Sequence, residues 1–76
     1  MTRKQFEHVL TTVGNRYPIT LVNVDGSVDY ETILYRLARS YSTDADEDRS
    51  SGYTATADQS ERVADLMFAL TDCLRN

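Results

Sequence analysis

The most constraining feature of this sequence is a long amphipathic pattern in residues 27–42. Its apolar residues recur at intervals of three and four positions, which places them on one side of an α-helix: Tyr30, Ile33, Leu34, Leu37, Ala38 and Tyr41. Thr32, Arg36 and Arg39 fall on the opposite side, where they can stay in water. The spacing predicts a helix from Ser27, as its N-cap, to Ser42, and the other segments must pack against it.

Two further helices are expected, one on each side of this central helix. Thr2 and Gln5 have the spacing of a capping box, and an apolar stripe follows them: Phe6, Val9, Leu10 and Val13. Thr56 and Gln59 repeat that spacing before a second stripe, which we expect to face the core: Val63, Leu66, Met67, Leu70 and Leu74.

Two short segments favour β-structure. Residues Ile19–Val24 are apolar and β-branched, which is typical of a buried strand, and Asp25-Gly26 follows as a turn. Residues 53–57 alternate weakly and would pair with that strand in parallel. The sequence therefore predicts an α+β fold of three amphipathic helices and a minimal two-stranded sheet, in the order α-β-α-β-α. An all-α three-helix bundle is the alternative.

Length and composition indicate one small globular domain over residues 1–76. The single cysteine, Cys73, excludes an internal disulfide and fits a reducing, cytoplasmic setting. No apolar run reaches the ~20 residues that cross a bilayer, so no membrane partner is expected. The chain has one histidine, one cysteine, one lysine and no glycine-rich phosphate loop. We therefore expect it not to be an enzyme and to have no catalytic residues and no cofactor.

Negative charge is concentrated in the second half of the chain. The formal net charge is −4, and residues 43–76 hold eight acidic residues against three arginines. Residues 42–52, with the sequence STDADEDRSSG, are predicted to form a solvated acidic loop. Such a surface repels nucleic acid and anionic membranes, and it favours basic partners.

The acidic segment matches a calcium loop only in part. Asp44, Asp46 and Asp48 occupy the first three ligand positions of an EF-hand. The sixth position needs glycine and holds Arg49, and the twelfth needs glutamate and holds Ala55. No metal site is therefore predicted, and a weak calcium-binding module is kept only as a further alternative.

A row of carboxylates is predicted along the last helix. At about 100° per residue, four acidic residues fall within an arc of about 60°, with Phe68 near its edge: Asp58, Glu61, Asp65 and Asp72. Like charges at this spacing repel, so the row does not strengthen the helix. It is either a solvated face, with Phe68 covered by a neighbouring segment, or a surface that imitates a nucleic-acid backbone and is extended by Asp44–Asp48.

In size, single-domain economy and carboxylate display, the chain resembles the class of small acidic phage-encoded inhibitors that includes anti-CRISPR proteins, some of which mimic DNA. The resemblance rests on no motif. It implies a non-enzymatic inhibitor in the host cytoplasm that occupies the positively charged nucleic-acid-binding surface of a protein complex and binds no nucleic acid itself. The expected contact residues are Asp44, Asp46, Glu47, Asp48, Asp58, Glu61, Asp65 and Asp72, with Phe68 as anchor.

A structural or assembly module is the alternative from another class. Tyr35 and Val28 point away from the core stripe, so they are expected either to pack on the small sheet or to contact another chain. A homodimer joined around Tyr35 would fit the assembly module, whereas a monomer is expected of the inhibitor.

Overall fold

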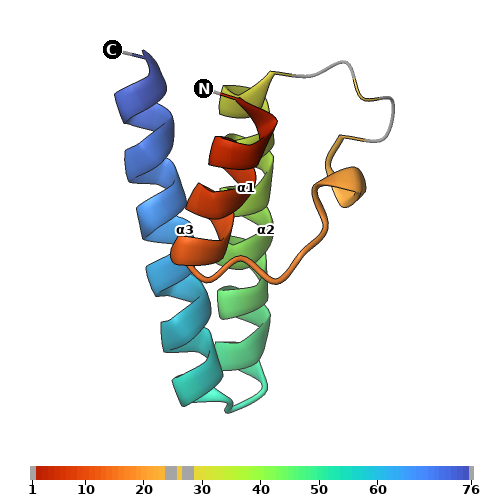
Figure 1. The fold of residues 1–76 in the computed structure, drawn as a ribbon. Helices are drawn as coiled ribbons and strands as arrows, with labels where there is room; N and C mark the ends of the chain where they lie inside the picture. The colour runs from red at the N-terminus through yellow and green to blue at the C-terminus, as the bar shows by residue number, and fades with distance from the viewer. Residues whose placement is uncertain (1, 24–25, 27–28, 76) are drawn as a thin grey trace.

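The computed structural model describes residues 2–23, 26 and 29–75 (Figure 1). Its elements are α1 (Arg3–Thr12), the 3-10 turn η1 (Ile19–Leu21), α2 (Tyr30–Ser50) and α3 (Thr54–Arg75). α2 and α3 form an antiparallel hairpin, and α1 packs against one of its faces near the end that holds both termini (Figure 1). Among the described residues there is no strand, so the predicted α+β fold is wrong and the all-helical alternative is supported.

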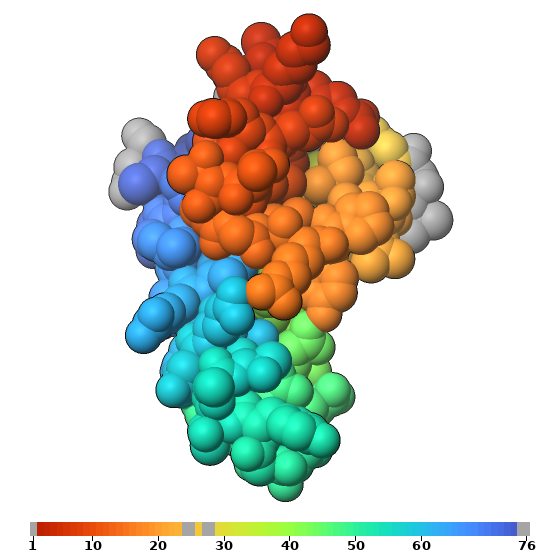
Figure 2. Space-filling view, turned by 60° about the horizontal axis from the view of Figure 1, so that its bottom comes forward, coloured from red at the N-terminus to blue at the C-terminus, as the bar shows by residue number. Residues whose placement is uncertain are grey.

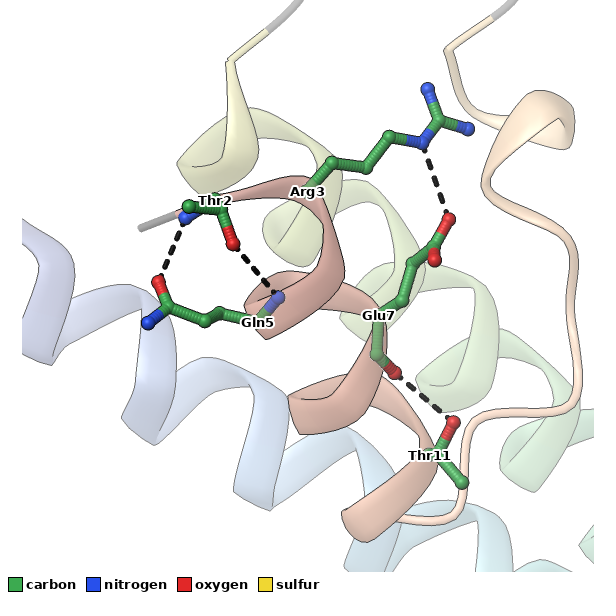
Figure 3. Close-up of polar contacts among 5 residues, drawn as sticks. All are labelled: Thr2, Arg3, Gln5, Glu7 and Thr11. Atoms are coloured by element: carbon green, nitrogen blue, oxygen red, sulfur yellow. Dashed lines mark hydrogen bonds and ion pairs between the residues drawn. The ribbon is translucent and has the colours of Figure 1, made fainter.

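α1 begins as predicted. The amide of Thr2 donates to Oε1 of Gln5 at 2.8 Å, and the amide of Gln5 donates to Oγ1 of Thr2 at 3.2 Å, which completes the capping box (Figure 3). Arg3 and Glu7 form an exposed ion pair at 3.2 Å one turn apart. The helix ends just before Gly14, whose φ of 89° is the left-handed conformation that glycine adopts without strain.

The predicted strand at residues 19–24 is instead an irregular segment with one 3-10 turn. The amide of Leu21 donates to the carbonyl of Pro18, and that of Val22 donates to Ile19, both at 3.1 Å. A strand needs a neighbour for its backbone groups, and residues 53–57 offer none because they are helical or lead into a helix. The predicted strand end at Val24 and turn residue Asp25 lie outside the described residues, as do Ser27 and Val28 themselves. The prediction of an N-cap at position 27 is wrong, because α2 begins after Asp29.

α2 is longer than predicted at its C-terminal end. Asp29 is the N-cap, since its carboxylate accepts from the amide of Thr32 at 2.8 Å, and this bond lowers the pKa of Asp29. The helix then runs through Ser42 to Ser50, so the predicted acidic loop at 42–52 is wrong. Ala45 explains the extension: it continues the buried stripe one turn beyond Tyr41 and packs in the hairpin.

α3 also begins earlier than predicted. Residues 51–53 connect the helices, and Gly52 adopts a φ of 87°. The predicted strand at 53–57 is wrong because Ala57 is fully buried as part of the first turns of α3. Thr56 therefore lies inside the helix, and the predicted capping box of Thr56 and Gln59 does not form its start.

One apolar core joins the three helices. Its buried members are Phe6, Leu10, Ile33, Leu34, Leu37, Ala38, Tyr41, Val63, Ala64 and Met67. The predicted stripe of α2 is confirmed as core, with Tyr30 partly buried at its start. In α1, Phe6 and Leu10 are confirmed and Val13 is partly buried, but Val9 does not belong to the core. The prediction for α3 is wrong at Leu66 and Leu74, which are 49% and 40% exposed. No helix in the described part of the chain is long and apolar enough to span a membrane.

Candidate functional site: an acidic hairpin tip

The excess negative charge of the chain gathers at the closed end of the α2–α3 hairpin. We call residues 44–62 the acidic tip; this segment contains two arginines and six carboxylates, those of Asp44, Asp46, Glu47, Asp48, Asp58 and Glu61. Its formal charge of −4 equals that of the whole chain, so the remaining residues sum to zero. Figure 2 shows this end of the hairpin projecting beyond α1 and the segment that follows it.

One guanidinium bridges the two helices at the tip. Nη2 of Arg49 lies 3.4 Å from Oδ1 of Asp58 and also pairs with Oε2 of Glu61. These two bonds raise the pKa of Arg49, with the contact to Glu61 as the larger cause. All three side chains are exposed, so the pairs add little stability, and one positive charge leaves the trio negative.

The four acidic residues of the predicted loop do not share a face. Because they lie in a regular helix, Asp44 and Asp48 follow the core stripe of α2 and are half-buried, whereas Asp46 and Glu47 are exposed. The hydroxyl of Tyr17 donates to Oδ2 of Asp44. This bond, burial and the negative charges nearby raise the pKa of Tyr17 to about 12.

Phe68, the predicted anchor, is only partly exposed. Its ring is half-buried against Tyr35 of α2, with the centroids 5.9 Å apart and the planes at 70°. The guanidinium of Arg39 lies 5.9 Å from the Tyr35 centroid and makes a 3.3 Å hydrogen bond to its hydroxyl. Tyr35 thus packs on Phe68 of α3 instead of on a sheet.

Asp65 and Asp72 continue the carboxylate row away from the tip. Both are exposed, and neither forms an ion pair with a described side chain. Asp65 lies about 6 Å beyond Glu61 along the axis of α3, and Asp72 lies about 10 Å further. The row predicted from the sequence is therefore present, with Asp58 and Glu61 at the tip, Asp65 next to it and Asp72 near the opposite end.

Sequence analysis missed Tyr53, the aromatic residue of the tip itself. It is 65% exposed, and its ring stacks with no other described ring. Its backbone is held, since its amide donates to the carbonyl of Asp48 at 2.8 Å. The signal in the sequence was an aromatic residue directly after Gly52, at the end of an acidic run.

The tip does not resemble a metal site. Asp44, Asp46 and Asp48 occupy every second position of a helix, so each side chain is turned about 200° around the helix axis from the next. Three such carboxylates cannot converge on one cation. Among the described residues, no group of three or more histidine, cysteine or acidic side chains could hold a metal ion.

The molecule also has a cleft of about 400 Å³ between residues 17–22 and α2. Its polar groups are engaged within the protein: the hydroxyls of Ser40 and Thr43 donate to the carbonyls of Arg36 and Arg39, and Asp44 accepts from Tyr17. None of these groups is paired as a nucleophile with a base. The cleft therefore offers no recognisable catalytic arrangement.

No family model, no curated protein and no solved structure matches this chain. Its function must therefore be argued from its own charges and contacts.

Proposed function

We propose that this protein is a non-enzymatic binding protein whose acidic tip occupies a basic, nucleic-acid-binding surface of another protein or complex. It acts there as an inhibitor, in the way that a DNA mimic of the anti-CRISPR type does, and it works in the cytoplasm of the cell. It needs no cofactor and does not itself bind nucleic acid, because its tip repels phosphates.

The observation that carries the proposal is the placement of the whole net charge on a projecting end of the fold. Six carboxylates stand on two helices that are held together by Ala45, Ala57 and the Arg49 bridge. Because the helices are rigid, the charges are presented without the entropic cost of ordering a loop. A surface that binds DNA through lysine and arginine offers the complementary potential, and the tip would compete for the same side chains.

Tyr53 is a more exposed aromatic contact than Phe68. A partner's guanidinium can stack on the exposed phenol ring and reach a neighbouring carboxylate at the same time. Exposed tyrosines of this kind are common among the residues that dominate binding energy. The proposal therefore assigns the contact to Asp46, Glu47, Asp58, Glu61 and Tyr53, with Asp65 at its border.

The proposal can be tested by capture of host proteins on the immobilised chain, with identification by mass spectrometry. We expect the captured protein to bind DNA, and we expect excess duplex DNA or about 0.5 M salt to release it, since exposed charge contacts are screened at short range. The double substitution D46N/E47Q and the single substitution Y53A should each lose capture, because they remove groups that we assign to the contact. The fold should be kept in both variants, since all three side chains are exposed.

The matched control is Glu7→Lys on α1, which changes the net charge by the same amount as D46N/E47Q but lies far from the tip. This variant should capture the partner as the unaltered chain does. If E7K and D46N/E47Q weaken capture equally, only total charge matters and the tip is not the site. If duplex DNA fails to displace the partner, the mimicry of nucleic acid is wrong.

A further inference from the structure

An apolar ridge on α3 is left uncovered by the fold. Leu66 and Leu74 are 49% and 40% exposed, Ala69 and Cys73 are exposed, and Leu70 is half-buried. These five residues lie on one side of the helix, between the carboxylate row and the groove toward α1. We call them the outer ridge. Scattered apolar residues are normal on a surface, but a contiguous ridge along more than two turns is typical of an interface.

A shallow, open hollow lies on the surface of α1. It is lined by Lys4, Gln5, His8 and Val9. Gln5 extends toward α3 from this side of α1 (Figure 3). The molecule thus carries a raised apolar element and a recess next to each other, which is the combination that a self-complementary two-fold contact requires.

The two elements are level with each other along the bundle. α1 and α3 run in opposite directions (Figure 1), and a Cβ on Gly14 would lie 3.6 Å from Cγ2 of Val63. Lys4 is ten residues before Gly14 and Cys73 is ten residues after Val63, so both lie about 15 Å from that contact. The hollow of α1 therefore lies beside the half of α3 that bears Leu70, Asp72 and Leu74.

Charge is also complementary across this face. Lys4 and His8 lie on its α1 side, whereas Asp65 and Asp72 lie on the far side of α3. A two-fold axis parallel to the helices places the α1 side of one copy opposite the α3 side of the other. Lys4 then faces the partner's Asp72, and the same pair occurs twice. An antiparallel arrangement would instead place the α1 side against itself.

We infer that this face joins two copies of the chain, with the outer ridge of each copy seated in the hollow on α1 of its partner. The inferred dimer differs from the monomer that the sequence analysis expects of an inhibitor. The inference is independent of the proposed function, because the acidic tip lies outside the contact. The parallel axis has a consequence for that function, since it places both acidic tips at the same end of the dimer. Two tips would then meet a basic surface together.

Sedimentation of the purified chain over a wide range of concentrations tests the inference. We expect a monomer–dimer equilibrium that varies little with salt, because its main contact is apolar. The substitution Leu66→Glu should raise the dissociation constant at least about tenfold, because Leu66 is the most exposed leucine of the ridge and would bring a charge into an apolar contact. Leu21→Glu is the matched control, because Leu21 is 62% exposed but lies outside the ridge. The dissociation constant of the L21E dimer should equal that of the unaltered chain.

A charge exchange tests the orientation of the two copies. Lys4→Glu should weaken the dimer by about two- to thirtyfold, because the exposed ion pair is lost at both of its symmetry-related positions. The double variant K4E/D72K should restore it, because the pair is re-formed with its signs reversed. Circular dichroism should show the same helical content in all of these variants.

Three results would overturn the inference. The first is a monomer at every concentration up to the millimolar range. The second is a dimer that L66E leaves intact. The third is a loss of affinity in K4E that D72K does not repair, which would contradict the parallel axis even if the ridge forms the contact.

Discussion

At the scale of single residues, the bond between Tyr17 and Asp44 ties the irregular segment between α1 and α2 to α2 itself. Tyr17 also packs against Tyr41, with ring centroids 5.0 Å apart. The hydroxyl of Tyr41 donates to Oδ1 of Asn15 at 3.0 Å and accepts from the amide of Arg16 at 2.5 Å. These contacts satisfy the backbone of a segment that has no regular hydrogen-bond ladder. They also turn Asp44, which sequence analysis placed in the binding site, into a structural residue.

The titration of Tyr17 tests this assignment. We expect its phenol to ionise near a pKa of about 12, well above the usual 10, since the protonated hydroxyl donates to Asp44. The raised pKa means that the contribution of Tyr17 to stability is complete below pH 10 and is lost as the pH rises through about 12. Ultraviolet difference spectra, with Y17F to assign the signal, measure the pKa. In D44N it should fall toward 10, and an unchanged value would contradict the bond.

At the scale of elements, a helix could be predicted from the sequence where a capping signal and the spacing of the apolar residues agree. The capping box of Thr2 and Gln5 and the stripe through Phe6 and Leu10 predicted α1 correctly. Residues 43–50 of α2 were missed because most of them are polar or acidic, and their only buried apolar side chain is that of Ala45. Packing against α3 overrides the weak local preference there, and one alanine is a faint signal of such packing.

The substitution Ala45→Gly tests the helical extension. In a helix interior glycine costs about 1 kcal/mol relative to alanine, and loss of the buried methyl adds to this. We therefore expect the free energy of unfolding to fall by about 1–2 kcal/mol in urea titrations. Ser51→Gly, one residue beyond the end of α2, should change it far less. Equal effects at both positions would mean that residues 42–50 are not helical in solution.

At the scale of the molecule, sequence analysis found the acidic character of the site but not its shape. The carboxylate row of α3 follows from helical spacing alone, and it is present. The division between Asp46 and Asp44, the Arg49 bridge and the packing of Tyr35 on Phe68 all depend on how α2 packs on α3. Pairings between helices of this kind are not encoded in the period of either helix. The uncovered tip, likewise, follows from α1 being much shorter than the hairpin.

The small size of the core makes the molecule sensitive to one side chain. A chain of this length is expected to have a free energy of unfolding of about 4–11 kcal/mol. Leu37 is fully buried among the three helices, so Leu37→Ala should remove about 2–5 kcal/mol, a large share of the total. Leu21→Ala deletes the same atoms from an exposed side chain and should change the value by less than about 0.5 kcal/mol. Chemical denaturation of both variants measures the contrast. The tip contributes only Ala45 and Ala57 to the buried apolar residues, so it cannot hold the hairpin together without the core around Leu37. We therefore expect α1 and the hairpin to unfold together in L37A. If L37A lost only α1, the hairpin would fold by itself.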